Sequence, residues 1–152
     1  MKRKAMLHQI SRNPEIIFED DDLVVVNKPA GVIVHRAPGH EDGSLADALA
    51  STRSSMRMVG SAERPGVVHR LDIDTSGVVV FAKNRSSYVS LRKAFESHKD
   101  VVKTYLAVLH GSPQEKTGRI ETLIGRKPWD AKRMAVDVPG GKRAVSNWTV
   151  LA

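Results

Sequence analysis

The stretch RPGVVHRLDIDTSGVVVFAKN, residues 64–84, sets four polar side chains between two apolar runs. VVHRL and GVVVFAK are short and rich in β-branched residues, which predicts a strand on each side of a bend. The bend carries His69, Arg70, Asp72 and Asp74 within six positions. Such residues ordinarily form a solvated turn, so a functional interpretation needs support from the rest of the chain.

Strands and a helix are also predicted before the bend. Residues 15–35, EIIFEDDDLVVVNKPAGVIVH, indicate three strands separated by an acidic turn and a Pro-Gly turn. Ser44, with Asp47 three residues later, is typical of a capped helix start and predicts a short helix over SLADALAST. Residues 54–66, SSMRMVGSAERPG, have no period and are predicted to form a loop.

A second helix and more strands are predicted after the bend. In residues 84–100, Tyr88, Leu91 and Phe95 share one face of a helix that Asn84 or Ser86 can cap. Further strands are predicted in VVKTYLAVLHG, GRIETLIG and RMAVDVPGGKRAVSNWTVLA, with PGGK as a hairpin turn. The order favours an α+β fold, a mixed and largely antiparallel β-sheet with two or more helices, over a doubly wound βαβ layout.

Composition and charge bound the chemistry. At 152 residues there is room for one domain, and the absence of cysteine excludes disulfides, thiolate chemistry and cysteine-ligated metal centres. No long apolar segment follows the basic N-terminal residues 1–15, so we expect no signal peptide or membrane span and a cytoplasmic protein. Lys and Arg exceed Asp and Glu by 24 to 17, and the net charge of +7 makes nucleic acid a candidate partner.

The bend is open to more than one chemistry. Asp72 and Asp74 could hold Mg²⁺ against a substrate phosphate, although the preceding basic pair competes for the carboxylates. His69 is more often a structural hydrogen-bonding residue than a catalyst, and Asp74 is expected to cap the turn. An ionised Asp72 beside Arg70 could instead act on a sugar anomeric carbon, and a nucleobase leaving group would need no second acid.

The bend and its neighbours resemble the RluA-type pseudouridine synthases. The resemblance runs from about residue 16 to the end of the chain. Five segments occur in the family's order: DDLVVVNKPAGVIVH, RPGVVHRLDIDTSGVVVFAKN, KTYLAVLHG, IGRKPWDAKRMAV and GGKRAVSNWTVL. Five ordered segments are far more specific than any single motif.

The resemblance implies a pseudouridine synthase fold and a cofactor-free, metal-free isomerase of uridine in ribosomal or transfer RNA. Asp72 matches the family's essential aspartate, and Tyr105 matches the tyrosine that stacks on uracil and can transfer protons. Arg70 matches the arginine that helps to hold the target nucleotide out of the RNA helix. The further RNA-facing candidates are His69, Lys103, Arg126 and Arg133.

Members of this family continue beyond the position of Ala152 into a segment that supplies a basic partner for the catalytic acid. We therefore expect residues 16–152 to be a catalytic domain that lacks its C-terminal portion, preceded by the basic segment 1–15, and monomeric when full-length. Two alternatives stay open. The chain could bind RNA without turnover, or it could be a Mg²⁺-dependent phosphohydrolase that uses Asp72 and Asp74.

Overall fold

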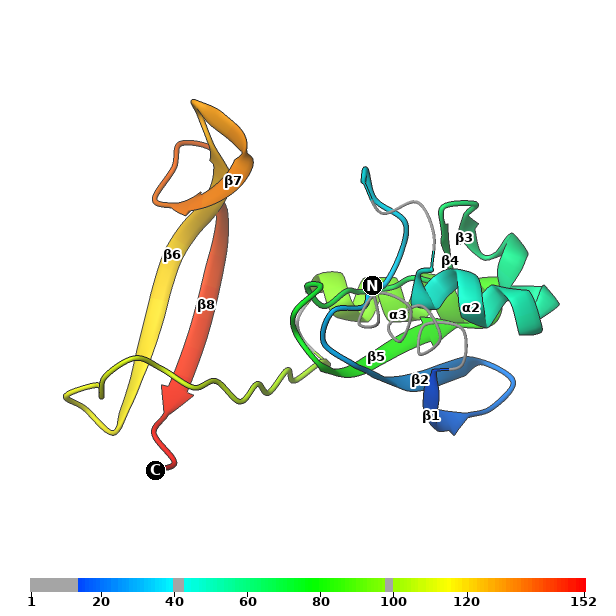
Figure 1. Cartoon of the computed structure of the whole chain (residues 1–152), viewed down its shortest axis with the longest axis horizontal. Helices are drawn as coiled ribbons and strands as arrows, with labels where there is room; N and C mark the ends of the chain where they lie inside the picture. The colour runs from blue at the N-terminus through cyan, green and yellow to red at the C-terminus, as the bar shows by residue number, and fades with distance from the viewer. Residues whose placement is uncertain (1–13, 40–42, 98–99) are drawn as a thin grey trace, which may run out of the picture. The chain divides into compact units, whose positions relative to one another are not determined.

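The computed structural model describes residues 14–39, 43–97 and 100–152 (Figure 1). The chain divides into two compact units, one up to Thr104 and the other from Tyr105 onward. Nearly all of the predicted N-terminal segment 1–15 lies outside the described residues. Within the described ranges, no helix has both the length and the apolar character needed to cross a membrane.

The first unit is built on a three-stranded antiparallel sheet in the order β1-β2-β5. Its strands are β1 (Glu15–Glu19), β2 (Leu23–Lys28) and β5 (Gly77–Ala82). The acidic turn between β1 and β2 is closed by Asp20, whose carboxylate accepts hydrogen bonds at 2.8 Å from two following backbone amides. The sequence prediction is confirmed for these three strands.

Residues 32–35, predicted as a third strand, form no strand. The carbonyl oxygens of Ile33 and Val34 instead accept hydrogen bonds at 3.0 Å from the first two amides of α2 (Leu45–Thr52). The first amides of a helix have no partner within the helix, so these carbonyls cap α2 rather than pair in the sheet. This prediction was wrong because a long-range partner replaced the ladder.

The predicted start of α2 is confirmed. The Ser44 hydroxyl accepts a hydrogen bond from the Asp47 backbone amide at 3.2 Å and donates one to the Asp47 carboxylate at 2.7 Å. Leu45 and Leu49 of this helix are fully buried. They join the sheet residues in one core whose main members are Val24, Val26, Leu45, Leu49, Met56, Val79 and Phe81.

The predicted loop over residues 54–66 contains regular structure. It begins with a 3₁₀ helix, η1 (Ser54–Met58), and ends in a short hairpin of β3 (Gly60–Ser61) and β4 (Arg64–Pro65). The predicted strand VVHRL is reduced to a single bridge between Val67 and Phe81, after which the chain leaves the sheet. The bend is therefore longer than the sequence predicted.

The helix α3 (Arg85–Ser97) follows β5, as predicted. The Asn84 side chain accepts a hydrogen bond from the Ser87 amide at 3.0 Å, which confirms Asn84 as the cap. No side chain of α3 is fully buried, and its apolar face is half-buried. Helix α3 therefore covers the unit from outside the core.

The second unit is a three-stranded antiparallel sheet in the order β7-β6-β8. Its strands are β6 (Thr117–Lys127), β7 (Asp130–Val136) and β8 (Lys142–Thr149). Both β7 and β8 pair with β6, so PGGK is not a hairpin turn between two paired strands. The tight turn lies instead at residues 128–129, between β6 and β7.

The segment VVKTYLAVLHG, predicted as a strand, forms no strand in the described part of the chain. Its alternating apolar side chains, among them Val102, Leu106 and Val108, are exposed. A strand exists only where its backbone groups find a partner, and none of the described residues supplies one. The α+β class is nevertheless confirmed, because the described elements are helices and strands of antiparallel sheets.

Candidate active site on the bend before β5

The bend presents the Asp72 carboxylate to solvent. Residues 68–76 belong to no strand or helix, and a turn closes where the Asp72 carbonyl accepts a hydrogen bond from the Thr75 amide at 3.1 Å. The Asp72 side chain is 85% exposed. An exposed carboxylate on a loop points toward a substrate in a defined direction only if the loop itself is held in place.

Lys28, at the end of β2, holds the loop from inside. Its ammonium group donates hydrogen bonds to the carbonyl oxygens of Ile73 at 2.9 Å and Pro29 at 3.0 Å, and Lys28 is fully buried. The Gly31 amide donates a second hydrogen bond to the Ile73 carbonyl at 2.7 Å. The backbone directly after Asp72 is therefore clamped by two donors from the Asn-Lys-Pro-x-Gly turn.

Burial lowers the pKa of Lys28, and the negative charges of Asp74 and Asp72 partly oppose this effect. The buried ammonium group of Lys28 thus interacts with the acidic bend by charge as well as by hydrogen bonds. The sequence-based site prediction did not include Lys28, because a lysine that ends an apolar strand is ordinarily exposed. The only signal was its place in the Asn-Lys-Pro-x-Gly turn.

Arg70 lies beside Asp72, as their two-residue spacing on the bend suggested. Its Nη2 is 3.6 Å from the Asp72 Oδ1, and the Arg70 side chain is 64% exposed. An ion pair this exposed contributes under about 1 kcal/mol to stability. The ion pair matters because it holds the Arg70 guanidinium next to the carboxylate, where an anionic substrate would bind.

His69 ties the bend to the rest of the unit. Its Nε2 accepts a hydrogen bond from the Val80 amide at 3.0 Å, and its ring stacks on Phe95 of α3 with 4.2 Å between centroids. Burial lowers the pKa of His69, and the positive charge of Lys103 lowers it further. These contacts favour the structural interpretation of His69 as a neutral acceptor, and its RNA-binding role stays a prediction.

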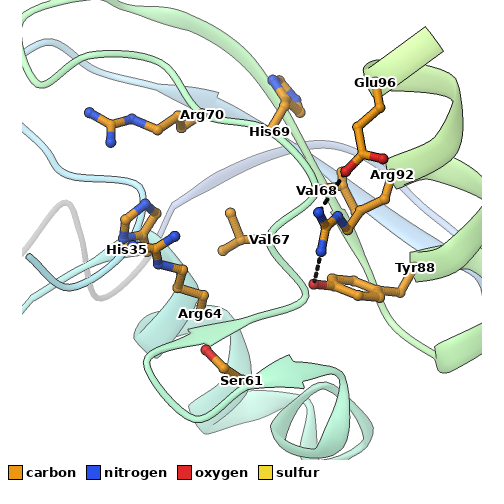
Figure 2. Close-up of a pocket in the computed structure, with 10 residues that line it drawn as sticks. All are labelled: His35, Ser61, Arg64, Val67, Val68, His69, Arg70, Tyr88, Arg92 and Glu96. Atoms are coloured by element: carbon orange, nitrogen blue, oxygen red, sulfur yellow. Dashed lines mark hydrogen bonds and ion pairs between the residues drawn. The ribbon is translucent and has the colours of Figure 1, made fainter. Parts of the chain in front are cut away.

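A hollow of about 400 Å³ opens beside Arg70 and His69 (Figure 2). Its wall includes two further arginines, Arg64 and Arg92, and a single carboxylate, Glu96. Burial lowers the pKa of His35 in the same wall, and the charges of Arg64 and Arg70 add to this effect, whereas a hydrogen bond to a backbone carbonyl opposes it. The hollow is therefore a cationic surface next to the proposed catalytic acid.

The structure brings Asp72, Arg70, His69 and Lys28 together in the first unit. Tyr105, Arg126 and Arg133 belong to the second unit, where Tyr105 is exposed and the two arginines lie on β6 and β7. Lys103 stands in the first unit, close enough for its charge to act on His69. The roles predicted for these residues stay predictions.

The described residues contain no group of three or more His, Asp and Glu side chains placed to bind a metal ion. What they offer is an exposed carboxylate on a clamped loop, a neighbouring guanidinium and a cationic hollow. The guanidinium groups of this arrangement suit a ligand that carries phosphate groups.

The comparison with known proteins agrees with this chemistry. The family model for RNA pseudouridylate synthase matches residues 22–152. The chain therefore belongs to the RNA pseudouridylate synthase family, and the resemblance seen in its sequence is confirmed. The match begins just before β2 and includes the clamp, the bend and the second unit.

Two relatives and two solved structures illustrate the relationship. An uncharacterized RNA pseudouridine synthase of Synechocystis sp. is 39% identical over 140 residues, which cover 90% of this chain and 42% of the relative. The ribosomal large subunit pseudouridine synthase D of Neisseria meningitidis is 42% identical over 137 residues, covering 90% of this chain and 35% of the relative. The chain thus spans less than half the length of these relatives.

The solved structures show the same fold. Human RNA pseudouridylate synthase domain containing 1 aligns with a TM-score of 0.68 at 27% identity, covering 93% of this chain and 53% of that protein. Human RNA pseudouridylate synthase domain containing 4 aligns with a TM-score of 0.70 at 25% identity, covering 97% and 58%.

Proposed function

We propose that this protein isomerises uridine to pseudouridine in RNA and that Asp72 is its catalytic carboxylate. The observation that carries the proposal is the clamp: Lys28 and Gly31 hold the Ile73 carbonyl and so direct an exposed Asp72 outward. Catalysis by a positioned group depends on such fixed geometry. Membership of the family supplies the reaction class.

In this reaction the bond between N1 of uracil and C1′ of ribose breaks, the base turns, and C5 becomes bonded to C1′. The C5 proton leaves and N1, freed from C1′, takes up a proton, so the overall change is an isomerisation. Asp72 either bonds to C1′ or assists formation of a glycal intermediate. Arg70, beside it, contacts the RNA phosphate, and Tyr105 stacks on the uracil ring.

The substrate that we propose is RNA of the large ribosomal subunit. Three relatives that are named as ribosomal large subunit pseudouridine synthase D are 38%, 42% and 39% identical to this chain. The net charge of +7 supports binding to a polyanion. Cytoplasmic location and a monomeric state stay predictions.

The test is release of tritium from RNA labelled at C5 of uridine, with large-subunit ribosomal RNA and transfer RNA as separate substrates and no added metal. We expect release by the wild-type protein and a loss of at least about a thousandfold in Asp72→Asn. Asp74→Asn is the matched control, because it makes the same change two residues away and should keep most of the turnover. Equal release by wild type and Asp72→Asn would contradict the proposal.

Phosphate release and RNA binding, measured beside this assay, separate the two alternatives. A Mg²⁺-dependent phosphohydrolase would need both carboxylates and would lose its phosphate release in EDTA. An RNA-binding protein without turnover would release no tritium in any variant and would still bind RNA in a salt-sensitive way.

A further inference from the structure

The hollow beside Arg70 is larger than the contact between one guanidinium and one phosphate requires. Its volume of about 400 Å³ falls within the range of sites that bind small molecules, and one nucleotide would fit it. The floor includes the apolar side chains of Val67 and Val68. An apolar floor with cationic walls matches a ligand that has a flat base at one end and a phosphate at the other.

One wall carries Arg64, whose charge also acts on the exposed carboxyl of its chain neighbour Glu63. No described side chain forms a hydrogen bond or an ion pair with Arg64, and its charge acts on His35, as that of Arg70 does. In the view of Figure 2, Arg64 and His35 lie on one side of Val67. Two guanidinium groups that act on one buried imidazole create a positive potential, which an entering phosphate would relieve.

The other wall is formed by side chains of α3, among them Tyr88 and Arg92, which we call the platform. The Arg92 guanidinium lies 5.8 Å from the centre of the Tyr88 ring and donates hydrogen bonds to the Tyr88 hydroxyl at 3.4 Å and to Glu96 at 2.6 Å. Figure 2 shows Tyr88 and Arg92 on the side of Val67 opposite to Arg64. Planar guanidinium and phenol groups held in this way are surfaces on which a base can stack.

The platform is positioned by the β3–β4 hairpin. A Cβ atom built on Gly60 would lie 3.3 Å from the Tyr88 ring and 2.9 Å from the Arg64 carbonyl oxygen. The Tyr88 ring therefore packs directly against the hairpin that carries Arg64. The phosphate wall and the stacking wall are parts of one packed arrangement.

We propose that this hollow is a second nucleotide subsite, which holds the RNA nucleotide next to the target uridine. Arg64 contacts its phosphate, and its base stacks on the platform of Tyr88 and Arg92. The inference rests on the proposed function for the identity of the polymer, but it concerns different residues and a different step, the binding of a neighbour rather than the reaction of the target.

The test measures binding of the 152-residue protein to a fluorescent seven-nucleotide RNA with uridine at its centre. Arg64→Gln should lower the affinity about fivefold and reduce the slope of log affinity against log salt by about 0.7, the loss of one phosphate contact on a single strand. Lys93→Gln is the matched control, since it removes one charge from the exposed surface of α3 outside the hollow. It should change neither quantity beyond a small uniform shift.

The stacking wall is tested with two RNAs that keep every phosphate. One lacks the base on the 5′ side of the uridine, and the other lacks the base on the 3′ side. For the wild type, loss of the base at one of the two positions should weaken binding about tenfold. Arg92→Gln and Tyr88→Leu should remove most of this difference. Tyr88→Leu could disturb the packing on Gly60, so thermal unfolding accompanies it and the exposed Arg92 variant stands as the independent test.

Equal affinity and salt slope in Arg64→Gln and Lys93→Gln would overturn the subsite. A base-dependent difference that persists in both platform variants would also overturn it, and so would an absence of RNA binding. Failure of the proposed function has a different signature. In that case the hollow variants would behave as expected in binding, and the wild type would release no tritium.

Discussion

Asp72 and Asp74 lie two positions apart on one bend, yet their surroundings differ. The Asp72 carboxylate has the Arg70 guanidinium at 3.6 Å. Asp74 forms no such pair with any described residue, and its charge, with that of Asp72, opposes the lowering of the Lys28 pKa by burial. The carbonyl between them, that of Ile73, is the one that receives both clamping hydrogen bonds. The clamp therefore acts at the single residue that separates Asp72, the proposed catalytic acid, from Asp74.

Lys28→Met tests this clamp at the scale of a residue. The variant keeps the buried volume but removes the donor to Ile73, so we expect turnover to fall about a hundredfold through misplacement of Asp72. The free energy of unfolding should change by under about 2 kcal/mol, because the lost hydrogen bonds are offset by no longer burying a charge. Tritium release and urea unfolding measure the two effects, and Lys93→Met is the surface control. Unchanged turnover would contradict the positioning role.

His69 gives the fold a dependence on pH. Its pKa is lowered by burial in the folded state, so it contributes stability that is present above the unfolded pKa of 6.5 and lost as the pH falls through the lower folded value. Protonation also destroys the acceptor for the Val80 amide. We expect urea midpoints to fall from pH 7.5 to pH 5, and His69→Gln, whose amide oxygen can still accept, to reduce this fall. The part due to His35, whose pKa is also lowered by burial, should remain. A fall of equal size in His69→Gln would exclude this role.

At the scale of elements, Gly66, which follows β4 in the Arg-Pro-Gly segment, links the β3–β4 hairpin to β5 by a backbone hydrogen bond. Gly66 adopts a φ of +70°, its carbonyl accepts the Ala82 amide at 2.9 Å, and a Cβ there would lie 2.5 Å from the Ala82 carbonyl oxygen. Both the conformation and the close approach require glycine. Gly66 of the Arg-Pro-Gly segment is thus explained by packing rather than by chemistry.

Gly66→Ala should lower the free energy of unfolding by more than about 3 kcal/mol, because strain in the left-handed region and a backbone clash act together. Gly140→Ala separates the two causes, since Gly140 has a φ of +73° and nothing within 4 Å of an added Cβ. That control should lose only about 1 kcal/mol. Chemical denaturation of both variants gives the comparison, and equal losses would show that the contact with Ala82 does not matter.

The elements that were predicted correctly have local causes. The cap of α2 depends on Ser44 and Asp47, three positions apart, and the cap of α3 depends on Asn84 and Ser87. Two of the predictions that failed concern residues 32–35 and 101–111, where β-branched sequence favours a strand but pairing depends on distant backbone. A carbonyl that binds a helix amide cannot be distinguished by sequence from one that binds a strand.

At the scale of the whole molecule, charge would govern the proposed encounter with RNA. The second unit contributes eight basic and four acidic residues in 48 positions, and the first supplies the arginines of the hollow. Exposed positive charge of this kind binds the phosphate backbone without regard to sequence.

We therefore expect the affinity for single-stranded RNA to fall steeply with salt. Three or more phosphate contacts, at about 0.7 each, predict a slope of log affinity against log salt steeper than about −2. Fluorescence anisotropy at salt concentrations between about 50 and 200 mM measures this slope. Polyglutamate of similar length serves as the control polyanion and should bind more weakly at every salt concentration. An affinity independent of salt would contradict an RNA-binding surface built on Lys and Arg.

The sequence by itself determined the family, the candidate acid at position 72 and the helix starts, because these depend on residue types at short spacing. Only the tertiary structure decided that Lys28 is buried beneath the bend, that Ile33 and Val34 cap a helix, and that Arg64 and Arg92 face one hollow. Each of these contacts joins positions far apart in the chain. Their existence depends on how the elements pack, which no local pattern records.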